Sequence, residues 1–414
     1  MTLPSVSRRG FLHSVGAGAA ATMWIPKAVA GYTGVEIKAK ADAGTLGVGV
    51  SKWELDTPAL CVDIDKLEQN IATMKKTITA NGIASRPHSK THKTPAIAKM
   101  QLAGGSIGIC AAKVSEAEAM FAGGVEKILM TTCNLSPHKI RRAMAIRKAN
   151  RQYIQAVDNP ENARDLNDAA KELGIVADVV VDVAVGTRSG VPAGEKALAL
   201  AQLVDTLPNL TLRGMISYDG GVQHFKGFKY RSEEAVNRYA PSLETYEAMK
   251  KSGLNTEIFS GGGSGTYNIM HKVPGFTDVQ AGSYIFMDAQ YLEIGGEQNE
   301  KIFTDFTPSL TVMTTVLNTY FPGRLTTDAG SKALTLNKPD AIVIGEEGFS
   351  YNAGSDEFGA IRYETSNKTY KAGDKLELIV PHCDPAVNEY DQIYATRNDR
   401  VEAIWQVAAR GHSQ

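Results

Sequence analysis

The sequence predicts an α/β protein, in which a large unit built on a parallel sheet is followed by a smaller all-β domain. From Thr57 onward, short apolar runs alternate with longer amphipathic runs, which is the pattern of βα units. After about Glu300 the runs become short and β-rich, and Gly, Pro, Asn and Asp interrupt them. The chain has 414 residues, 43% of them hydrophobic, so it can bury one large core and a smaller one.

The large unit shows nine strand-like runs, with helix-like runs between nearly all of them. The strand-like runs are Ala59–Asp63, Ala84–Pro87, Ile107–Cys110, Ile128–Thr131, Tyr153–Val157, Ala177–Val183, Leu212–Ser217, Glu257–Phe259 and Asp278–Phe286. The helix-like runs include Asp65–Ala80, Pro95–Leu102, Val114–Ala122, Ala193–Asp205 and Ser232–Ser252. A (βα)8 barrel requires eight strands, one fewer than this count. A doubly wound open sheet is the alternative, because periodicity alone cannot close a barrel.

The smaller domain is predicted from seven further runs without a long helical period between them. These runs are Leu310–Thr319, Leu325–Asp328, Ala341–Glu346, Ile361–Tyr363, Lys375–Val380, Gln392–Thr396 and Val401–Val407. The segment from about Val35 to Glu54 is expected to join them. The large unit, residues 57–300, would then be inserted between residues 35–56 and 301–414.

The first 30 residues have the features of a targeting segment. Arg8 and Arg9 precede a weakly apolar run from Val15 to Ile25, and Ala28-Val29-Ala30 offers a small-x-small cleavage site. This pattern predicts a twin-arginine signal, hence a periplasmic protein exported already folded. The alternative is a disordered start that happens to carry two arginines.

Charge and cysteine content exclude several classes of protein. The formal net charge is −1, so there is no electrostatic argument for nucleic acid or an anionic membrane as partner. No apolar run reaches the roughly 18–20 residues of a spanning helix. The four cysteines are scattered and form neither a disulfide framework nor a CxxC metal site. Cys61 and Cys110 lie in apolar strand-like runs and are expected to be buried thiols.

The residues from Arg86 to Thr94 concentrate reactive side chains. Two histidines, three cations and a proline occupy these nine positions at the end of a short strand. Neighbouring cations lower the pKa of a lysine, and Lys90 could thereby serve as a Schiff-base amine. On composition alone, a basic solvated loop is the competing interpretation.

Two later segments could bind a phosphate. Gly262, Gly263 and Ser264 belong to a glycine-rich run that follows a strand directly, and such a run can turn backbone N–H groups toward an anion. Gly282 and Ser283 follow the last strand of the large unit and would supply the second half. A plain flexible turn is the alternative for the glycine-rich run.

These motifs together resemble the D-threonine aldolase / D-serine dehydratase family, whose barrel is similar to that of alanine racemase. The run Arg-Pro-His-x-Lys-x-His-Lys ending at Lys93 is similar to the family's pyridoxal-phosphate (PLP) lysine motif. The resemblance implies an alanine racemase-like (βα)8 TIM-type barrel plus a smaller all-β domain. It makes Lys90 the cofactor lysine and its strand the first of the barrel, so that Ala59–Asp63 precedes the barrel.

The resemblance also assigns residues around the cofactor. The glycine-rich run and Ala281–Tyr284 look like the family's phosphate-binding pair. Arg188 would face the pyridine nitrogen and keep it unprotonated, although its run differs by about a residue from the family's Asp-x-Gly-x-x-Arg. The run from Tyr218 to His224 resembles Tyr-His-Gly-x-x-Gln-His, which implies that Tyr218 lies at the cofactor and that His224 is the base for the substrate's β-hydroxyl. The family's first histidine is Asp219 here.

The run Pro381–Pro385 is similar to the family's metal motif, Ser-His-x-Asp-Pro. If the preceding strand continues, His382 and Asp384 share one face and Cys383 points away. The dehydratase branch has Cys in place of Asp384. A carboxylate favours a harder ion such as Mn²⁺ or Mg²⁺.

The resemblance therefore implies a PLP- and metal-dependent lyase that cleaves D-3-hydroxy amino acids to glycine and an aldehyde. A dehydratase acting by β-elimination is the main alternative. A PLP carrier without turnover and a racemase are less favoured. Dimers are usual in the family, so a homodimer is expected.

Overall fold

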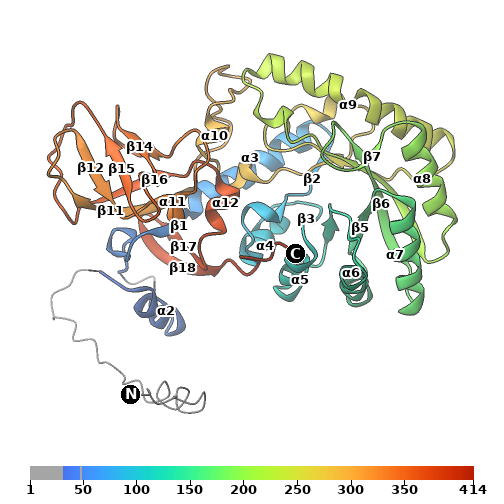
Figure 1. Cartoon of the computed structure of the whole chain (residues 1–414), viewed down its shortest axis with the longest axis horizontal. Coiled ribbons are helices and arrows are strands. Elements are labelled where there is room, and N and C mark those ends of the chain that lie inside the picture. The colour runs from blue at the N-terminus through green and yellow to red at the C-terminus, as the bar shows by residue number, and fades with distance from the viewer. Residues whose placement is uncertain (1–30, 47–48) are drawn as a thin grey trace, which may run out of the picture.

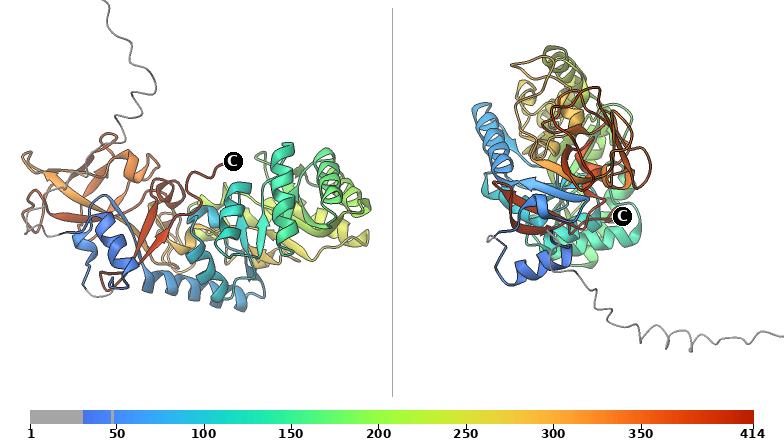
Figure 2. Two further views of the ribbon diagram at one scale, coloured as in Figure 1. Left: turned by 90° about the horizontal axis from the view of Figure 1, so that it is seen from below. Right: turned by 90° about the vertical axis from the view of Figure 1, so that its left-hand side faces the viewer.

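The computed structural model describes residues 31–46 and 49–414, and the predicted signal segment, residues 1–30, lies outside them. The molecule is elongated, with a β-rich domain at one end and an α/β domain at the other (Figures 1 and 2). Within the described residues, no helix combines the length and the apolar character needed to cross a membrane.

The α/β domain is a barrel of parallel strands. Its strands run in the spatial order β2-β10-β9-β8-β6-β5-β4-β3, with the short β7 added at β6. A parallel bridge between His88 and Cys110 joins the two ends, and the Cys110 N–H donates to the Pro87 carbonyl at 2.8 Å. The barrel interpretation is therefore confirmed, and the open doubly wound sheet is wrong.

The elements of the barrel follow the predicted alternation. Its strands are β2 (Ala84–Ser85), β3 (Ile109–Ala111), β4 (Ile128–Met130), β5 (Ile154–Val157), β6 (Ala177–Ala184), β7 (Val191–Pro192), β8 (Leu210–Ser217), β9 (Ile258–Gly261) and β10 (Asp278–Val279). Its helices are α3 (Ile64–Ala80), α4 (Pro95–Ala103), α5 (Val114–Ala122), α6 (Pro137–Ala149), α7 (Pro160–Glu172), α8 (Glu195–Thr206), α9 (Phe228–Lys251) and the short α10 (Ala289–Leu292). The short 3-10 helices are η2 (Ser89–Thr91), η3 (Val222–His224), η4 (Met270–Lys272) and η5 (Ser283–Ile285).

Helix α3 illustrates why these segments fold as they do. Asp63 caps its N-terminus, accepting the Lys66 N–H at 3.1 Å. Its buried residues Leu67, Met74 and Ile78 recur at helical spacing and form one apolar face. Inside the barrel, a separate apolar cluster fills the space between the strands, as a closed eight-stranded barrel requires; it consists of Cys110, Leu129, Ile154, Ala156, Val180, Ile216 and Ile258.

The β-rich domain contains a second sheet, in the order β14-β15-β12-β11-β1-β17-β18, with β16 pairing both β11 and β13. The strands are β1 (Ala59–Asp63), β11 (Leu310–Asn318), β12 (Arg324–Thr327), β13 (Ile342–Val343), β14 (Ser350–Asn352), β15 (Gly359–Arg362), β16 (Lys375–Ile379), β17 (Gln392–Arg397) and β18 (Arg400–Gln406). The short helices α11 (Ser331–Leu334) and α12 (Cys383–Val387) connect them.

Strand β1 belongs to this second sheet. It pairs antiparallel with β11 and parallel with β17. The strand therefore precedes the barrel, as the resemblance implied, and the barrel segment begins with α3 at Ile64 rather than at residue 57. The N-terminal piece, with α2 (Gly34–Asp42) and η1 (Lys52–Glu54), also packs here. Ile37 of α2 and Leu55, just after η1, are both fully buried and share an apolar cluster with Ala59 and Cys61 of β1.

Three local expectations need correction. Strand β10 covers only Asp278–Val279, because the chain then turns into η5 instead of continuing to Phe286. Strand β14 was not predicted, since its three residues carry no apolar run. Strand β16 ends at Ile379 and does not continue through Asp384. All four cysteines are free, and Cys61 and Cys110 are buried as expected.

Candidate active site

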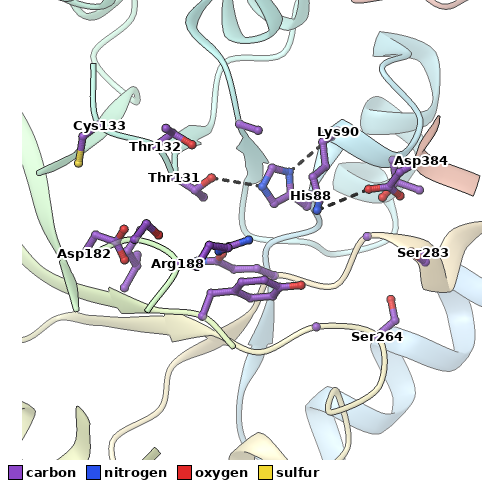
Figure 3. Close-up of a pocket in the computed structure, with 18 of the residues that line it drawn as sticks. His88, Lys90, Thr131, Thr132, Cys133, Asp182, Arg188, Ser264, Ser283 and Asp384 are labelled. Atoms are coloured by element: carbon purple, nitrogen blue, oxygen red, sulfur yellow. Dashed lines mark hydrogen bonds and ion pairs between the residues drawn. The ribbon is translucent and has the colours of Figure 1, made fainter. Parts of the chain in front are cut away.

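A cavity of about 430 Å³ lies at the carboxyl ends of the barrel strands, where the β-rich domain meets the barrel. Lys90 enters it from the first barrel strand, and His382 and Asp384 enter it from the β-rich domain. Arg188, Tyr218 and His224 also line it. Figure 3 shows Lys90 directed toward Asp384, with Ser264 and Ser283 on two loops below Asp384 and with Asp182 on the far side of Arg188. The motifs singled out in the sequence therefore converge on one cavity.

Lys90 lies in the tight turn η2, which hydrogen bonds hold in place. The His88 ring accepts the Lys90 N–H through Nδ1 at 3.4 Å. On the other side of the turn, the Ser89 hydroxyl lies 2.9 Å from the Cys110 carbonyl and 2.5 Å from Glu116 Oε1. Both Ser89 and Glu116 are buried. The lysine is thus carried on a rigid turn, which suits a side chain that must hold a cofactor in one orientation.

The electrostatic environment of Lys90 differs from the predicted one. The Lys90 Nζ lies 3.5 Å from Asp384 Oδ2. Attraction by Asp384 raises the pKa of Lys90, and this outweighs the effects of burial and of Arg188, which lower it. The expected lowering was wrong because it counted only the cations adjacent in sequence. Asp384 is almost 300 positions away, and only the tertiary structure brings it to Lys90.

The two predicted phosphate segments meet in space, but not every residue in them faces the cavity. Ser264 and Ser283 line it together with Gly263 and Gly282. The Tyr284 N–H donates to Ser264 Oγ at 2.9 Å, which ties one segment to the other. A Cβ at Gly282 would lie 2.3 Å from Thr91 Oγ1, so only glycine allows this loop to approach the lysine turn.

Gly262 has a different role from the predicted one. It is not among the residues that line the cavity. Its φ of +60° lies in the left-handed region that favours glycine. Its N–H donates to the hydroxyl of the buried Tyr239 at 3.2 Å. Gly262 therefore shapes the turn, and Gly263 and Ser264 form the wall of the cavity.

Arg188 and Tyr218 form a stacked pair in the cavity. The guanidinium carbon lies 4.8 Å from the centroid of the Tyr218 ring. Asp158 and Asp182 line the wall on the same side, and neither was predicted. Burial, followed by repulsion from Asp158, raises the pKa of Asp182 to about 6. The sequence offered no signal for these acids beyond their position, Asp158 just after a strand-like run and Asp182 near the end of one.

His224 is the last residue of the short helix η3 and faces the side of the cavity that carries the predicted metal ligands. Its ring packs against Tyr291, with the centroids 4.8 Å apart. Burial lowers the pKa of His224, despite the opposing effect of Asp288. The imidazole is therefore neutral at pH 7 and can accept a proton.

His382 is oriented by a buried carboxylate that sequence reasoning missed. Asp288 Oδ2 lies 2.9 Å from His382 Nδ1 and also accepts the Cys383 N–H at 3.0 Å. Asp288 is fully buried. A carboxylate on one ring nitrogen of a histidine leaves the other as the ligand atom, the arrangement that supports metal-binding histidines. In the sequence, Asp288 shows only the pattern of a helix N-cap for α10.

The metal motif does not form a strand. Pro381 has no N–H for a ladder, and the N–H groups of Ala289 and Gln290 bond to the carbonyls of Val380 and Pro381 at 3.0 and 3.2 Å. The chain then turns into α12, which places His382 just before the helix and Asp384 in its first turn. The predicted face-sharing of a strand was therefore wrong, although both residues reach the cavity.

Cys383 does not point away as expected. Its sulfur lies within 4.8 Å of ligand atoms of Asp288 and His382. It is fully buried, however, and does not line the cavity. Burial, followed by the negative charges of Asp288 and Asp384, raises the pKa of this thiol well above its usual value. Cys383 therefore lies beside the predicted ligand His382 without facing the cavity.

The donor set fits a divalent cation. Burial would raise the pKa of Asp384, but Lys90 and His382 lower it to about 2, so the carboxylate is charged. One imidazole and one charged carboxylate, both on the wall of the cavity, are suited to an ion that also binds water or substrate oxygens. The cavity fits PLP as well, since it offers an amine, two serine hydroxyls and an arginine around a space of suitable size.

Comparison with known proteins identifies the family. The alanine racemase N-terminal domain model matches residues 62–290, and the putative serine dehydratase domain model matches residues 309–396. The chain is 35% identical over 366 residues to 3-hydroxy-D-aspartate aldolase of Paracoccus denitrificans, covering 88% of this chain and 94% of that one. The chain belongs to the alanine racemase-like family of PLP-dependent enzymes that includes this aldolase.

Two further relatives extend the comparison. The crystal structure of D-threonine aldolase from Filomicrobium marinum superposes with a TM-score of 0.83 at 31% identity, covering 88% of this chain and 99% of that one. D-threo-3-hydroxyaspartate dehydratase of a Delftia species is 30% identical over 291 residues, covering 69% of this chain and 74% of that one. The family thus contains both aldolases and a dehydratase, and in the sequence alignments the aldolase matches over 94% of its length and the dehydratase over 74%.

Proposed function

We propose that this protein is a PLP- and metal-dependent carbon–carbon lyase that cleaves D-3-hydroxy amino acids to glycine and an aldehyde by retro-aldol reaction. The observation that carries the proposal is the shared cavity, in which Lys90 Nζ lies 3.5 Å from Asp384 Oδ2. A cofactor amine and a metal-binding pair can therefore act on the same small molecule. The aldolase relatives support the same reaction.

Each residue of the cavity has a separate role in the proposed reaction. When bound, PLP supplies an electron sink for the charge left at Cα, and the metal ion polarises the substrate's β-oxygen. Lys90 would anchor PLP, Ser264 and Ser283 would bind its phosphate, and Arg188 would contact its ring. His382 and Asp384 hold the ion. His224 accepts the proton of the β-hydroxyl, for which its lowered pKa suits it.

The proposed ion is Mn²⁺ or Mg²⁺. Oxygen donors select hard cations, and here the second ligand is the carboxylate of Asp384. The neighbouring thiol of Cys383 is buried and outside the cavity. Activity assays of the metal-stripped protein with added Mn²⁺, Mg²⁺ or Zn²⁺ test this choice, and activity restored by Zn²⁺ alone would contradict it.

The second candidate is a dehydratase, as found in the Delftia relative. Product analysis with D-threonine separates the two reactions. Retro-aldol cleavage yields acetaldehyde and glycine, whereas β-elimination yields 2-oxobutanoate and ammonia. A panel that includes 3-hydroxy-D-aspartate and D-serine then identifies the side chain that the enzyme prefers.

We also propose that the protein is exported and that it forms a homodimer. The twin arginines Arg8 and Arg9 support export of the folded protein to the periplasm by the twin-arginine route. Fractionation of cells with an intact and an Arg9→Lys signal tests it. The β-rich domain exposes Tyr320 and Phe321, at 88% and 61%, which supports a homodimer. Light scattering of the purified protein gives the mass, and a monomer would refute the dimer.

A further inference from the structure

Asp219 is the position at which the chain departs from the histidine of the resembled motif. The residue is buried, with only 6% of its surface exposed. It lies between β8 and the short helix η3 that carries His224. Both its side chain and its main chain are engaged in hydrogen bonds, so its contacts show what the replacement does.

The side chain of Asp219 holds the turn that leads to His224. Its Oδ1 accepts the N–H of Gly221 at 2.8 Å and that of Val222 at 3.4 Å. Its Oδ2 accepts from Arg238 Nη1 on α9 at 3.1 Å. One carboxylate oxygen thus closes the turn, and the other anchors it to a neighbouring helix.

The main chain of Asp219 connects the same turn to the glycine-rich loop. Its N–H donates to the Tyr239 hydroxyl at 3.1 Å, which also accepts the N–H of Gly262 at 3.2 Å. Its carbonyl accepts from Gln223 Nε2 at 3.0 Å, and Gln223 Oε1 accepts the N–H of Gly265 at 3.1 Å. Tyr239 and Gln223 are fully buried, so both connections are rigid.

We propose that Asp219 is a positioning residue that sets the place of His224 relative to the glycine-rich loop. The inference rests on the proposed role of His224 as proton acceptor. A carboxylate is required at this position because it accepts from Gly221 and from Arg238 at once. A neutral histidine offers a single acceptor nitrogen and cannot do both. Asp219 therefore acts on the reaction through His224, without touching the substrate.

A double-mutant cycle on D-threonine cleavage tests this coupling. Asp219→Ala is expected to lower kcat by about 10-fold or more, a part of the 10²–10⁴-fold that a general base contributes. In a His224→Ala background the same substitution is expected to lower kcat by less than about 2-fold, because the group that Asp219 positions is gone. Equal losses in the two backgrounds, or an unchanged kcat in Asp219→Ala, would overturn the proposal.

A second measurement does not depend on activity. Hydrogen exchange of the protein should become faster in Asp219→Ala both in the segment 219–226 and in the segment 261–266. Faster exchange in the first segment alone would show that the glycine-rich loop is not held through Asp219. A wild-type protein without aldolase activity would refute the proposed function, and the exchange result would still decide the role of Asp219.

Two variants control for general loss of structure. Asp219→Asn keeps an oxygen for Gly221 but loses the charge that faces Arg238. Its kcat and its hydrogen exchange should therefore lie between those of wild type and Asp219→Ala, and the variant should remain folded. Glu234→Gln removes the other carboxylate near Arg238, at 3.5 Å, and Glu234 has no bond to the turn. Its kcat and exchange should equal those of wild type, and a loss as large as that of Asp219→Ala would contradict the proposal.

Discussion

The charged side chains at the two ends of the barrel are paired in different ways. At the amino ends of the strands, a cavity of about 340 Å³ is lined by charges that pair closely. Arg86 Nε lies 3.0 Å from Asp278, and Arg213 lies 2.7 Å from Asp178 and 2.6 Å from Glu257. These opposite charges form ion pairs, as expected at the end of a barrel that contributes to stability and not to catalysis.

At the carboxyl ends, the two cations that line the cavity, Lys90 and Arg188, are paired less closely with acids. Lys90 and Asp384 are separated by 3.5 Å, and among the described residues Arg188 stacks on Tyr218 without forming an ion pair. Groups that stay this loosely paired can exchange partners for a cofactor, an ion and a substrate. The comparison indicates that substitutions at the carboxyl ends should cost activity, and those at the amino ends should cost stability.

The largest effect is expected for Lys90→Ala. Without the amine, PLP has no covalent anchor, so D-threonine cleavage should fall by more than about 10³-fold. Borohydride reduction followed by mass spectrometry of the peptide checks the anchor directly. Reductive labelling that persists in the variant would place the cofactor on another lysine.

Asp384→Ala should lower D-threonine cleavage nearly as much as Lys90→Ala does. It removes the charged ligand, so added Mn²⁺ should not restore activity, and a strong chelator should abolish the activity of the wild type. Cys383→Ala is the matched control, since that thiol does not line the cavity; its Mn²⁺ affinity should remain within about 2-fold of wild type. Full activity in the presence of the chelator would contradict the metal requirement.

Asp288→Asn should have a smaller effect on the same site. The amide still contacts His382 but no longer holds its ring through a charged hydrogen bond, so Mn²⁺ affinity should fall by about 10- to 100-fold. Saturating Mn²⁺ should recover most of kcat. Titration calorimetry measures the affinity, and an unchanged value would show that Asp288 supports only the fold.

Asp278→Ala should leave catalysis almost unchanged. It removes the partner of the buried Arg86, and such a loss costs about 3–5 kcal/mol of unfolding free energy. The variant should therefore unfold at lower denaturant concentration while its kcat stays within about 2-fold of wild type. A large fall in kcat without a loss of stability would remove the contrast between the two ends.

Much of the site could be predicted because its motifs are short and local. Lys90, Ser264 and Ser283 follow barrel strands directly, and the carboxyl ends of parallel strands meet at one end of a barrel. What could not be predicted depends on contacts distant in sequence. In the sequence, Asp288 has only the pattern of an ordinary helix cap. The His382 side chain that it contacts is 94 positions further along the chain. The direction of the pKa shift of Lys90 likewise depends on Asp384.

The sequence by itself determined the alternation of strands and helices, the separate β-rich domain and the residue types of the site, since periodicity and motif chemistry are local properties of a chain. The tertiary structure alone decided that the barrel closes between His88 and Cys110, that His382 and Asp384 reach the cavity through a helix, and which charges face one another. The physical reason is that closure, hydrogen-bond partners and electrostatic fields depend on distances between residues far apart in the chain.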